Sequence, residues 1–248
     1  MALEIKNLCK QFENEEEATL QNINLTIEDG DFVCVVGMSG CGKSTLLNMI
    51  AGLEQPTRGE ILLDGKPVTG PGADRTVMFQ EHGLYPWLNV IENVMFGMQI
   101  KGISKEEQRE KAEYYLNMVN LWDYRDYPIH QISGGMRQRT ALARALTMDS
   151  EILLMDEPFS ALDKQTSNRL REELQNIWMK TKKTIFFITH SVEEAIYLSS
   201  RVVVLSPIVR GICEIVHNEL ERPRHVYSPE FVDLRHHILD EVRGGESV

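Results

Sequence analysis

Short continuous apolar runs, separated by longer stretches of mixed polarity, recur from residue 32 to residue 205. A run of this kind is typical of a strand in a parallel sheet that is buried on both faces. The intervening stretches carry apolar residues at helical spacing, so strands and helices alternate along the chain. This order predicts an α/β core with helices on the faces of the sheet. The predicted strands are Phe32–Val36, Thr76–Phe79, Ile152–Met155, Thr184–Thr189 and Val202–Leu205.

The N-terminal region has a different pattern. Partial alternation of apolar and polar residues predicts short strands at Leu3–Leu8, Leu20–Ile27 and Gly59–Leu63. We expect these strands to form a separate antiparallel sheet. The acidic stretch Glu13–Glu17 between the first two predicts a solvated hairpin loop.

The middle of the chain predicts an inserted helical subdomain. Ser104 and Glu107 have the spacing of a capping box, and the helix that they start continues through residue 119. We assign residues 81–145 to this subdomain. Residues 1–80 and 146–248 then form the core and its antiparallel sheet, within a single domain that spans 1–248.

Three more helices are predicted after the subdomain. Thr166–Lys180 has one apolar face, on which Trp178 is expected to pack in the core. Ser191 and Glu194 have the spacing of a second capping box, directly after His190. A final amphipathic stripe is formed by Phe231, Leu234, Ile238 and Val242.

The run GMSGCGKST follows the first predicted parallel strand and opens a helix, as a phosphate-binding P-loop does. Gly37, Gly40 and Gly42 allow successive backbone N–H groups to point at phosphate oxygens. Lys43 is expected to reach the β- and γ-phosphates, and the Ser44 hydroxyl to bind Mg²⁺. The strand before and the helix after make an ordinary glycine-rich turn a poor alternative. The predicted ATP-binding residues here are Gly37, Met38, Ser39, Gly40, Cys41, Gly42, Lys43, Ser44 and Thr45.

Two adjacent carboxylates come after the predicted strand Ile152–Met155. Asp156 lies at the carboxyl end of that strand, where it could hold Mg²⁺. Glu157 follows at once and could polarise the attacking water as a general base. An isolated Asp-Glu pair is a weak indication of function, but downstream of a P-loop it predicts a nucleoside triphosphatase.

The run ISGGMRQRTALARAL, from Ile132 to Leu146, adds a second helix start rich in glycine. With the two preceding motifs it makes the chain resemble an ABC-type nucleotide-binding domain over nearly its whole length. The resemblance implies a P-loop NTPase core that works as an ATP-dependent homodimer. In that family Ser133, Gly134 and Gly135 would face the γ-phosphate held by the partner copy, with Ser133, Gly135 and Asp163 at the dimer interface.

The resemblance assigns roles to four more motifs. Gln80 is similar to the family's glutamine that contacts the metal and the water, and His190 to its γ-phosphate histidine, which joins Glu157 and Lys43 as a catalytic residue. The segment Ser160–Asp163 resembles the loop that crosses the dimer interface. Phe12 is similar to the aromatic residue that stacks on adenine, a role for which an aromatic ring suffices.

Composition limits the partners. The net charge of -11 argues against a nucleic-acid partner. No apolar run approaches the ~20 residues that span a bilayer, and no N-terminal leader is evident. The four cysteines show no paired spacing, which indicates free thiols in a reducing cytosol. We therefore expect a peripheral protein on the cytoplasmic face of the cell membrane, attached through another protein.

Two functions remain open at this stage: the ATP-hydrolysing subunit of a membrane transporter, and a soluble ABC ATPase of the iron–sulfur cluster assembly type. Residues 81–97, EHGLYPWLNVIENVMFG, favour the transporter, because the corresponding region of such cassettes receives a short helix of the membrane subunit. This segment, the SGGMRQR run and the stretch Arg222–Leu239 resemble importers of the nitrate, sulfonate and taurine type. The implied partners are an integral membrane permease and an extracytoplasmic solute-binding protein.

Overall fold

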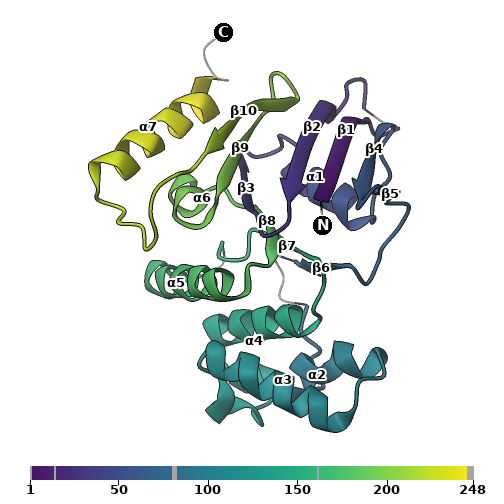
Figure 1. The fold of residues 1–248 in the computed structure, drawn as a ribbon, viewed down its shortest axis with the longest axis vertical. Helices are drawn as coiled ribbons and strands as arrows, with labels where there is room; N and C mark the ends of the chain where they lie inside the picture. The colour runs from purple at the N-terminus through teal and green to yellow at the C-terminus, as the bar shows by residue number, and fades with distance from the viewer. Residues whose placement is uncertain (1, 14, 80–82, 161, 245–248) are drawn as a thin grey trace.

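A computed structural model describes residues 2–13, 15–79, 83–160 and 162–244. Its centre is a six-stranded sheet in the order β10-β9-β3-β8-β7-β6 (Figure 1). The neighbours pair in parallel except for β9 and β10, which are antiparallel. The strands are β3 (Phe32–Gly37), β6 (Arg75–Met78), β7 (Ile152–Asp156), β8 (Thr184–Ile188), β9 (Arg201–Ser206) and β10 (Gly211–His217). The predicted α/β class and the predicted parallel strands are thus confirmed.

The central sheet is buried on both faces. Phe32, Cys34 and Val36 of β3 face one apolar cluster, whereas Val33 and Val35 face another. Successive side chains of a strand point to opposite faces. A strand covered on both sides must therefore be apolar at every position, which is why these runs could be recognised in the sequence.

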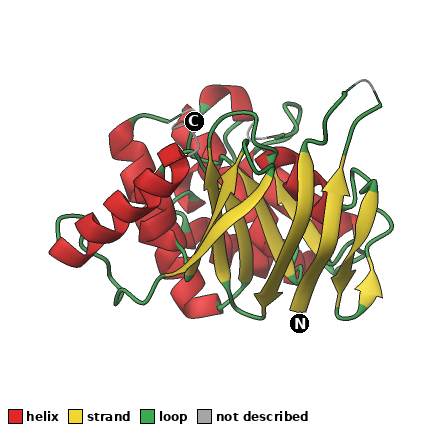
Figure 2. Ribbon diagram, turned by 90° about the horizontal axis from the view of Figure 1, so that it is seen from above, coloured by secondary structure: helices red, strands yellow, loops and turns green. Residues whose placement is uncertain are grey.

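A second, antiparallel sheet has the order β2-β1-β4-β5. Along β2 the apolar positions are buried and the polar ones exposed, the pattern of a sheet with one face on the core. Figure 2 shows the strands of both sheets next to one another and most of the helices gathered on one side of them. Helix α1 (Lys43–Ala51) shares a buried cluster with both sheets. The strands are β1 (Ala2–Lys10), β2 (Leu20–Glu28), β4 (Arg58–Leu63) and β5 (Lys66–Pro67).

The helical region lies at one end of the molecule (Figure 1). It contains α2 (Val90–Ile100), α3 (Lys105–Met118) and α4 (Gly134–Thr147). Short 3₁₀ turns at Trp122–Tyr124 and Ile129–Gln131 connect α3 to α4. The three helices bury apolar residues against one another and against the central sheet.

The helix caps differ in part from the sequence prediction. The hydroxyls of Ser104 and Ser191 each accept a hydrogen bond from the backbone N–H three residues later, as expected. The reciprocal half of the box is formed at neither serine. The Glu107 carboxylate pairs with Lys111, and the Glu194 carboxylate accepts from the Thr189 hydroxyl. A complete capping box occurs at Asn89, which the sequence analysis did not single out.

Three helices cover the other parts of the sheet: α5 (Lys164–Thr181), α6 (Val192–Leu198) and α7 (Pro229–Arg243). The predicted core role of Trp178 is confirmed: its ring is 7% exposed and lies 6.1 Å from that of Phe32. Its indole N–H donates to the Gly30 carbonyl. Across the described parts of the chain, no helix is both long and apolar enough to cross a membrane.

Trp178→Ala should lower the free energy of unfolding by about 3–5 kcal/mol, because it removes a large buried ring and leaves a cavity. Trp87→Ala is the matched control: Trp87 is 73% exposed, so the change should stay within about 0.5 kcal/mol. Urea unfolding followed by far-UV circular dichroism measures both. Equal destabilisation by the two substitutions would contradict the core role of Trp178.

Candidate functional site

The P-loop runs from the end of β3 to the start of α1, and two of its glycines are required by close contacts. A Cβ atom on Gly37 would lie 2.3 Å from the Leu205 carbonyl oxygen. Gly42 has φ of 95° and caps α1, and a Cβ there would lie 2.7 Å from the Leu20 side chain. Both positions therefore exclude a side chain, and the loop is held tightly between the two sheets.

Lys43 folds back over the loop. Its Nζ donates to the carbonyl oxygens of Gly37 and Met38, both at 2.9 Å, and the residue is 7% exposed. These acceptors are neutral, and no carboxylate of the described residues forms an ion pair with Lys43. The positive charge is thus fixed at the mouth of the loop without a direct ion pair, so its N–H donors can turn to a phosphate.

Ser44 and Asp156 meet beside the loop, although they are far apart in sequence. The Ser44 hydroxyl donates to Asp156 Oδ1 at 3.2 Å. Burial, and to a lesser extent the neighbouring Glu157, raise the pKa of Asp156, whereas the Ser44 bond and Lys43 lower it. A hydroxyl and a partly buried carboxylate are oxygen ligands of the kind that Mg²⁺ takes next to phosphates, so the donor set fits that ion.

Glu157 and His190 face each other across the same cleft. His190 Nδ1 lies 3.3 Å from Glu157 Oε2. Glu157 has a left-handed backbone, with φ of 44°, and its N–H donates to the Ile188 carbonyl of β8. A residue other than glycine is strained in this backbone conformation, and such strain is characteristic of functional sites. The Ser160 hydroxyl and N–H both donate to the Glu157 carbonyl and hold the turn in place.

Lys43, Ser44, Glu157 and His190 line one cleft of about 390 Å³, and Asp156 adjoins it through its bond to Ser44. Its lining consists of Thr19, Ser39, Gly40, Gly42, Lys43, Ser44, Thr45, Glu157 and His190. Most of the predicted P-loop residues are therefore brought together with the predicted base and the predicted histidine. Thr19 was not anticipated, because it reaches the cleft from the loop between β1 and β2.

Other predicted residues lie elsewhere. Phe12 is half-buried and packs under the Lys10 ammonium, 4.7 Å from its ring centroid, and does not line the cleft. The Cys41 side chain is buried, and burial raises the pKa of its thiol, so it points into the core. Gln80 lies outside the described residues.

The predicted dimer-interface residues also lie apart from this cleft. The exposed Ser133 caps α4 through a hydrogen bond from the Met136 N–H. Gly135 abuts the Thr166 side chain, where a Cβ atom would come within 2.7 Å. Asp163 caps α5, and the N–H and hydroxyl of Thr166 lower the pKa of its carboxyl. One chain thus presents the glycine-rich start of α4 away from its own phosphate-binding loop.

Two further residues support the site through contacts that the sequence analysis did not predict. The buried Gln138 of α4 donates from Nε2 to the carbonyl of Pro158, the residue after Glu157. The Glu194 carboxylate accepts a hydrogen bond of 2.6 Å from the hydroxyl of Thr189, the residue that precedes His190. The place of Gln138 in the SGGMRQR run could have marked it as a functional residue. Its bond to Pro158 could not be predicted from the sequence.

Known proteins share this arrangement. The profile of the ABC transporter family matches residues 20–160. An uncharacterized ABC transporter ATP-binding protein of Methanocaldococcus jannaschii is 54% identical over 96% of this chain and 90% of its own length. The nitrate import ATP-binding protein NrtD of Synechocystis is 45% identical, and the match covers 100% of this chain and 97% of NrtD. The taurine import ATP-binding protein TauB of Yersinia pseudotuberculosis is also 45% identical, and the match covers 93% of each chain.

A solved structure of an ATP-binding cassette has a similar fold. An ATP-binding cassette described as a dimer in a post-hydrolysis state, bound to ADP and Pi, superposes with a TM-score of 0.76 at 31% identity. The match covers 88% of this chain and all of that cassette. The P-loop cleft, the family profile and these relatives agree: the chain belongs to the ABC transporter family, as an ATP-hydrolysing subunit.

Proposed function

We propose that this chain powers the import of a small solute of the nitrate, sulfonate and taurine type through a membrane permease. The observation that carries the ATPase part is the cleft lined by Lys43, Ser44 and the Glu157–His190 pair, with Asp156 hydrogen-bonded to Ser44 beside it. The solute class rests on the relatives that import nitrate and taurine. No relative described above supports iron–sulfur cluster assembly.

Glu157 is the proposed general base. Its carboxylate is one-quarter exposed at the cleft, so it can reach a water molecule while its backbone is held by β8. His190 hydrogen-bonds to the same carboxylate and orients it. Lys43 places a fixed positive charge where negative charge develops on the transferred phosphoryl group, which is the larger contribution to catalysis.

Ser44 and Asp156 are the proposed Mg²⁺ ligands, together with Gln80. The ion would neutralise phosphate charge as a Lewis acid. The Asp156 carboxylate is half-buried, and the Ser44 hydroxyl and the Lys43 charge do not fully offset the burial that raises its pKa. That arrangement costs stability until a cation arrives, so the chain itself favours metal-bound nucleotide.

Two copies are proposed to close around ATP. Within one chain the exposed Ser133 at the start of α4 has no access to the cleft, whereas the N-terminus of a helix is a favourable place for a phosphate. A second copy, related by a two-fold axis, can supply this helix start to each cleft. The dimeric ADP-bound relative supports this reading.

The permease is proposed to dock on the aromatic loop before α2. Trp87 is exposed, and its ring packs on that of Tyr85, which in turn packs on Phe96. The buried Asn93 bonds to both the N–H and the carbonyl of Tyr85 and makes this loop rigid. A rigid aromatic surface suits a protein partner. The chain would then sit on the cytoplasmic face of the membrane, with a solute-binding protein on the other side.

Glu157→Gln should reduce ATP turnover by about 10²–10⁴-fold while ATP binding is retained, because the amide keeps the shape but loses basicity. With ATP and Mg²⁺ the variant should accumulate as a dimer. Phosphate release and light scattering measure the two effects. The control is Glu151→Gln, an exposed glutamate outside the cleft. Turnover close to wild type would exclude Glu157 as the base.

Asp156→Asn should stabilise the nucleotide-free chain at neutral pH and abolish its stabilisation by Mg²⁺ with ATP. Burial raises the pKa of the folded carboxyl, so the folded chain binds that proton more tightly than the unfolded chain does. The protonated Asp156 carboxyl therefore stabilises the folded chain below its unfolded pKa. This stabilisation is lost as the pH rises through the folded pKa. Thermal melts at several pH values test this; an Asn variant that is less stable than wild type at pH 7 would contradict it.

Deletion of this chain should abolish uptake of nitrate, taurine or an alkanesulfonate, and the wild-type chain but not Glu157→Gln should restore it. Uptake of each labelled solute by deletion and complemented cells is the measurement. If uptake of all three is unchanged while purified chain still hydrolyses ATP, the solute assignment is wrong and the ATPase assignment stands.

A further inference from the structure

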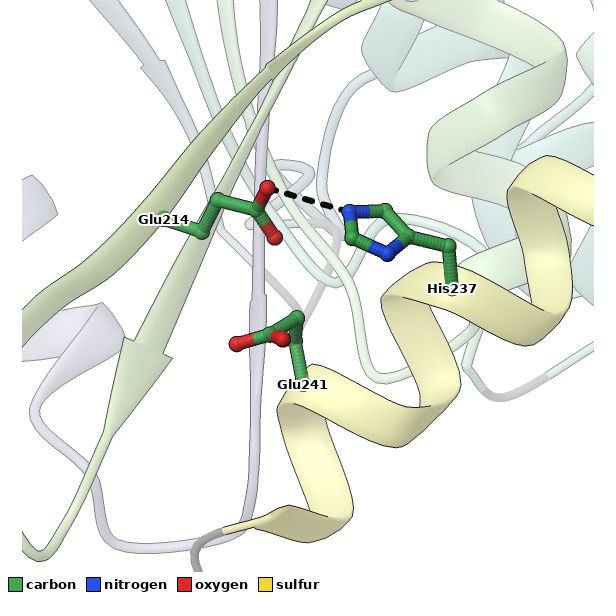
Figure 3. Close-up of side chains that lie close together, drawn as sticks. All are labelled: Glu214, His237 and Glu241. Atoms are coloured by element: carbon green, nitrogen blue, oxygen red, sulfur yellow. Dashed lines mark hydrogen bonds and ion pairs between the residues drawn. The ribbon is translucent and has the colours of Figure 1, made fainter.

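Helix α7 and the edge strand β10 bring three potential metal ligands together (Figure 3). Glu214 lies in the middle of β10. His237 and Glu241 lie one helical turn apart on α7, so their side chains share the face that is turned toward Glu214. None of the three belongs to the ATP cleft.

The distances suit a single ion after small side-chain movements. His237 Nε2 lies 3.0 Å from Glu214 Oε1, and one ligand atom from each residue lies within 4.8 Å of the other two. Zinc binds nitrogen and carboxylate oxygen at about 2.0–2.2 Å, so tetrahedral ligands are separated by roughly 3.3–3.6 Å. Rotation of the half-exposed Glu241 carboxylate toward the other two closes the remaining gap.

Among the described residues, no lysine or arginine forms an ion pair with Glu214 or Glu241, and His237 is the one basic side chain bonded to the cluster. Glu214 Oε2 is shielded from solvent and accepts no hydrogen bond from the described residues. The Glu241 carboxylate likewise has no hydrogen bond or ion pair among them. A buried acceptor without a donor requires an explanation, and a cation supplies one.

We propose that Glu214, His237 and Glu241 bind a divalent transition-metal cation of the zinc type, which clamps α7 onto the edge of the central sheet. An imidazole with two carboxylates is a donor set that zinc accepts. The clamp has a physical purpose, because Phe231 and Ile238 are the fully buried apolar residues of α7. Leu234, Leu239 and Val242 of α7 also pack on the core but are only partly buried, so a second attachment would add to the hold on this helix. The alternative is a plain hydrogen bond between His237 and Glu214.

The test uses the purified full chain, without an affinity tag, stripped with a chelator and kept free of nucleotide. Calorimetric titration with zinc should give one site in the wild type. Glu241→Gln and His237→Gln should bind zinc at least about tenfold more weakly, since each loses a ligand. Zinc should also raise the melting temperature of the wild type and slow amide hydrogen exchange in α7.

His236→Gln is the matched control, because His236 is an exposed neighbour on the same helix that is not part of the cluster. It should bind zinc as the wild type does, and ATP hydrolysis should be unchanged in all these variants. Glu241→Gln removes no hydrogen bond among the described residues, so the variant should fold as the wild type does, and an unchanged ATPase rate checks this. Equal zinc affinity in wild type and Glu241→Gln, or no zinc binding at all, would overturn the proposal.

Discussion

The close contact between Gly37 and the Leu205 carbonyl fixes where the chain leaves the central sheet, and the site depends on it. Because β3 is buried on both faces and pairs with β8 and β9, its end cannot shift. The loop that follows turns back so tightly that its own carbonyls hold the Lys43 ammonium. α1 then starts at the place where Ser44 meets Asp156 at the end of β7. The geometry of the phosphate site is therefore a consequence of sheet packing.

Sequence reasoning found what is encoded locally. Buried parallel strands are continuous apolar runs, and the P-loop has its own spacing, so both were placed within a residue or two. The two-residue β5 is too short to give a pattern, and the alternation of β10 is broken by a register shift between Ile212 and Glu214. Both strands were therefore missed.

Long-range contacts were also missed, for a different reason. The bond from Gln138 to Pro158 depends on how α4 packs against the sheet, which no local pattern reports. The bond from Thr189 to Glu194 spans only five residues, but it competes with the capping box and could not be distinguished from it by spacing. Glu194 even has the spacing of a capping box and yet uses its carboxylate elsewhere. The roles assigned to Ser133, Gly135 and Asp163 remain predictions, since they concern a second copy.

The bond between Gln138 and Pro158 has a mechanical consequence. α4 belongs to the helical end of the molecule, whereas Pro158 directly follows Glu157 in the turn after β7. A rigid rotation of the helical end must either carry the backbone beside the glutamate with it or break this bond. The buried Gln138 amide thus couples the two regions mechanically. A displacement of the helices would move the backbone next to Glu157, and a displacement of that backbone would move the helices.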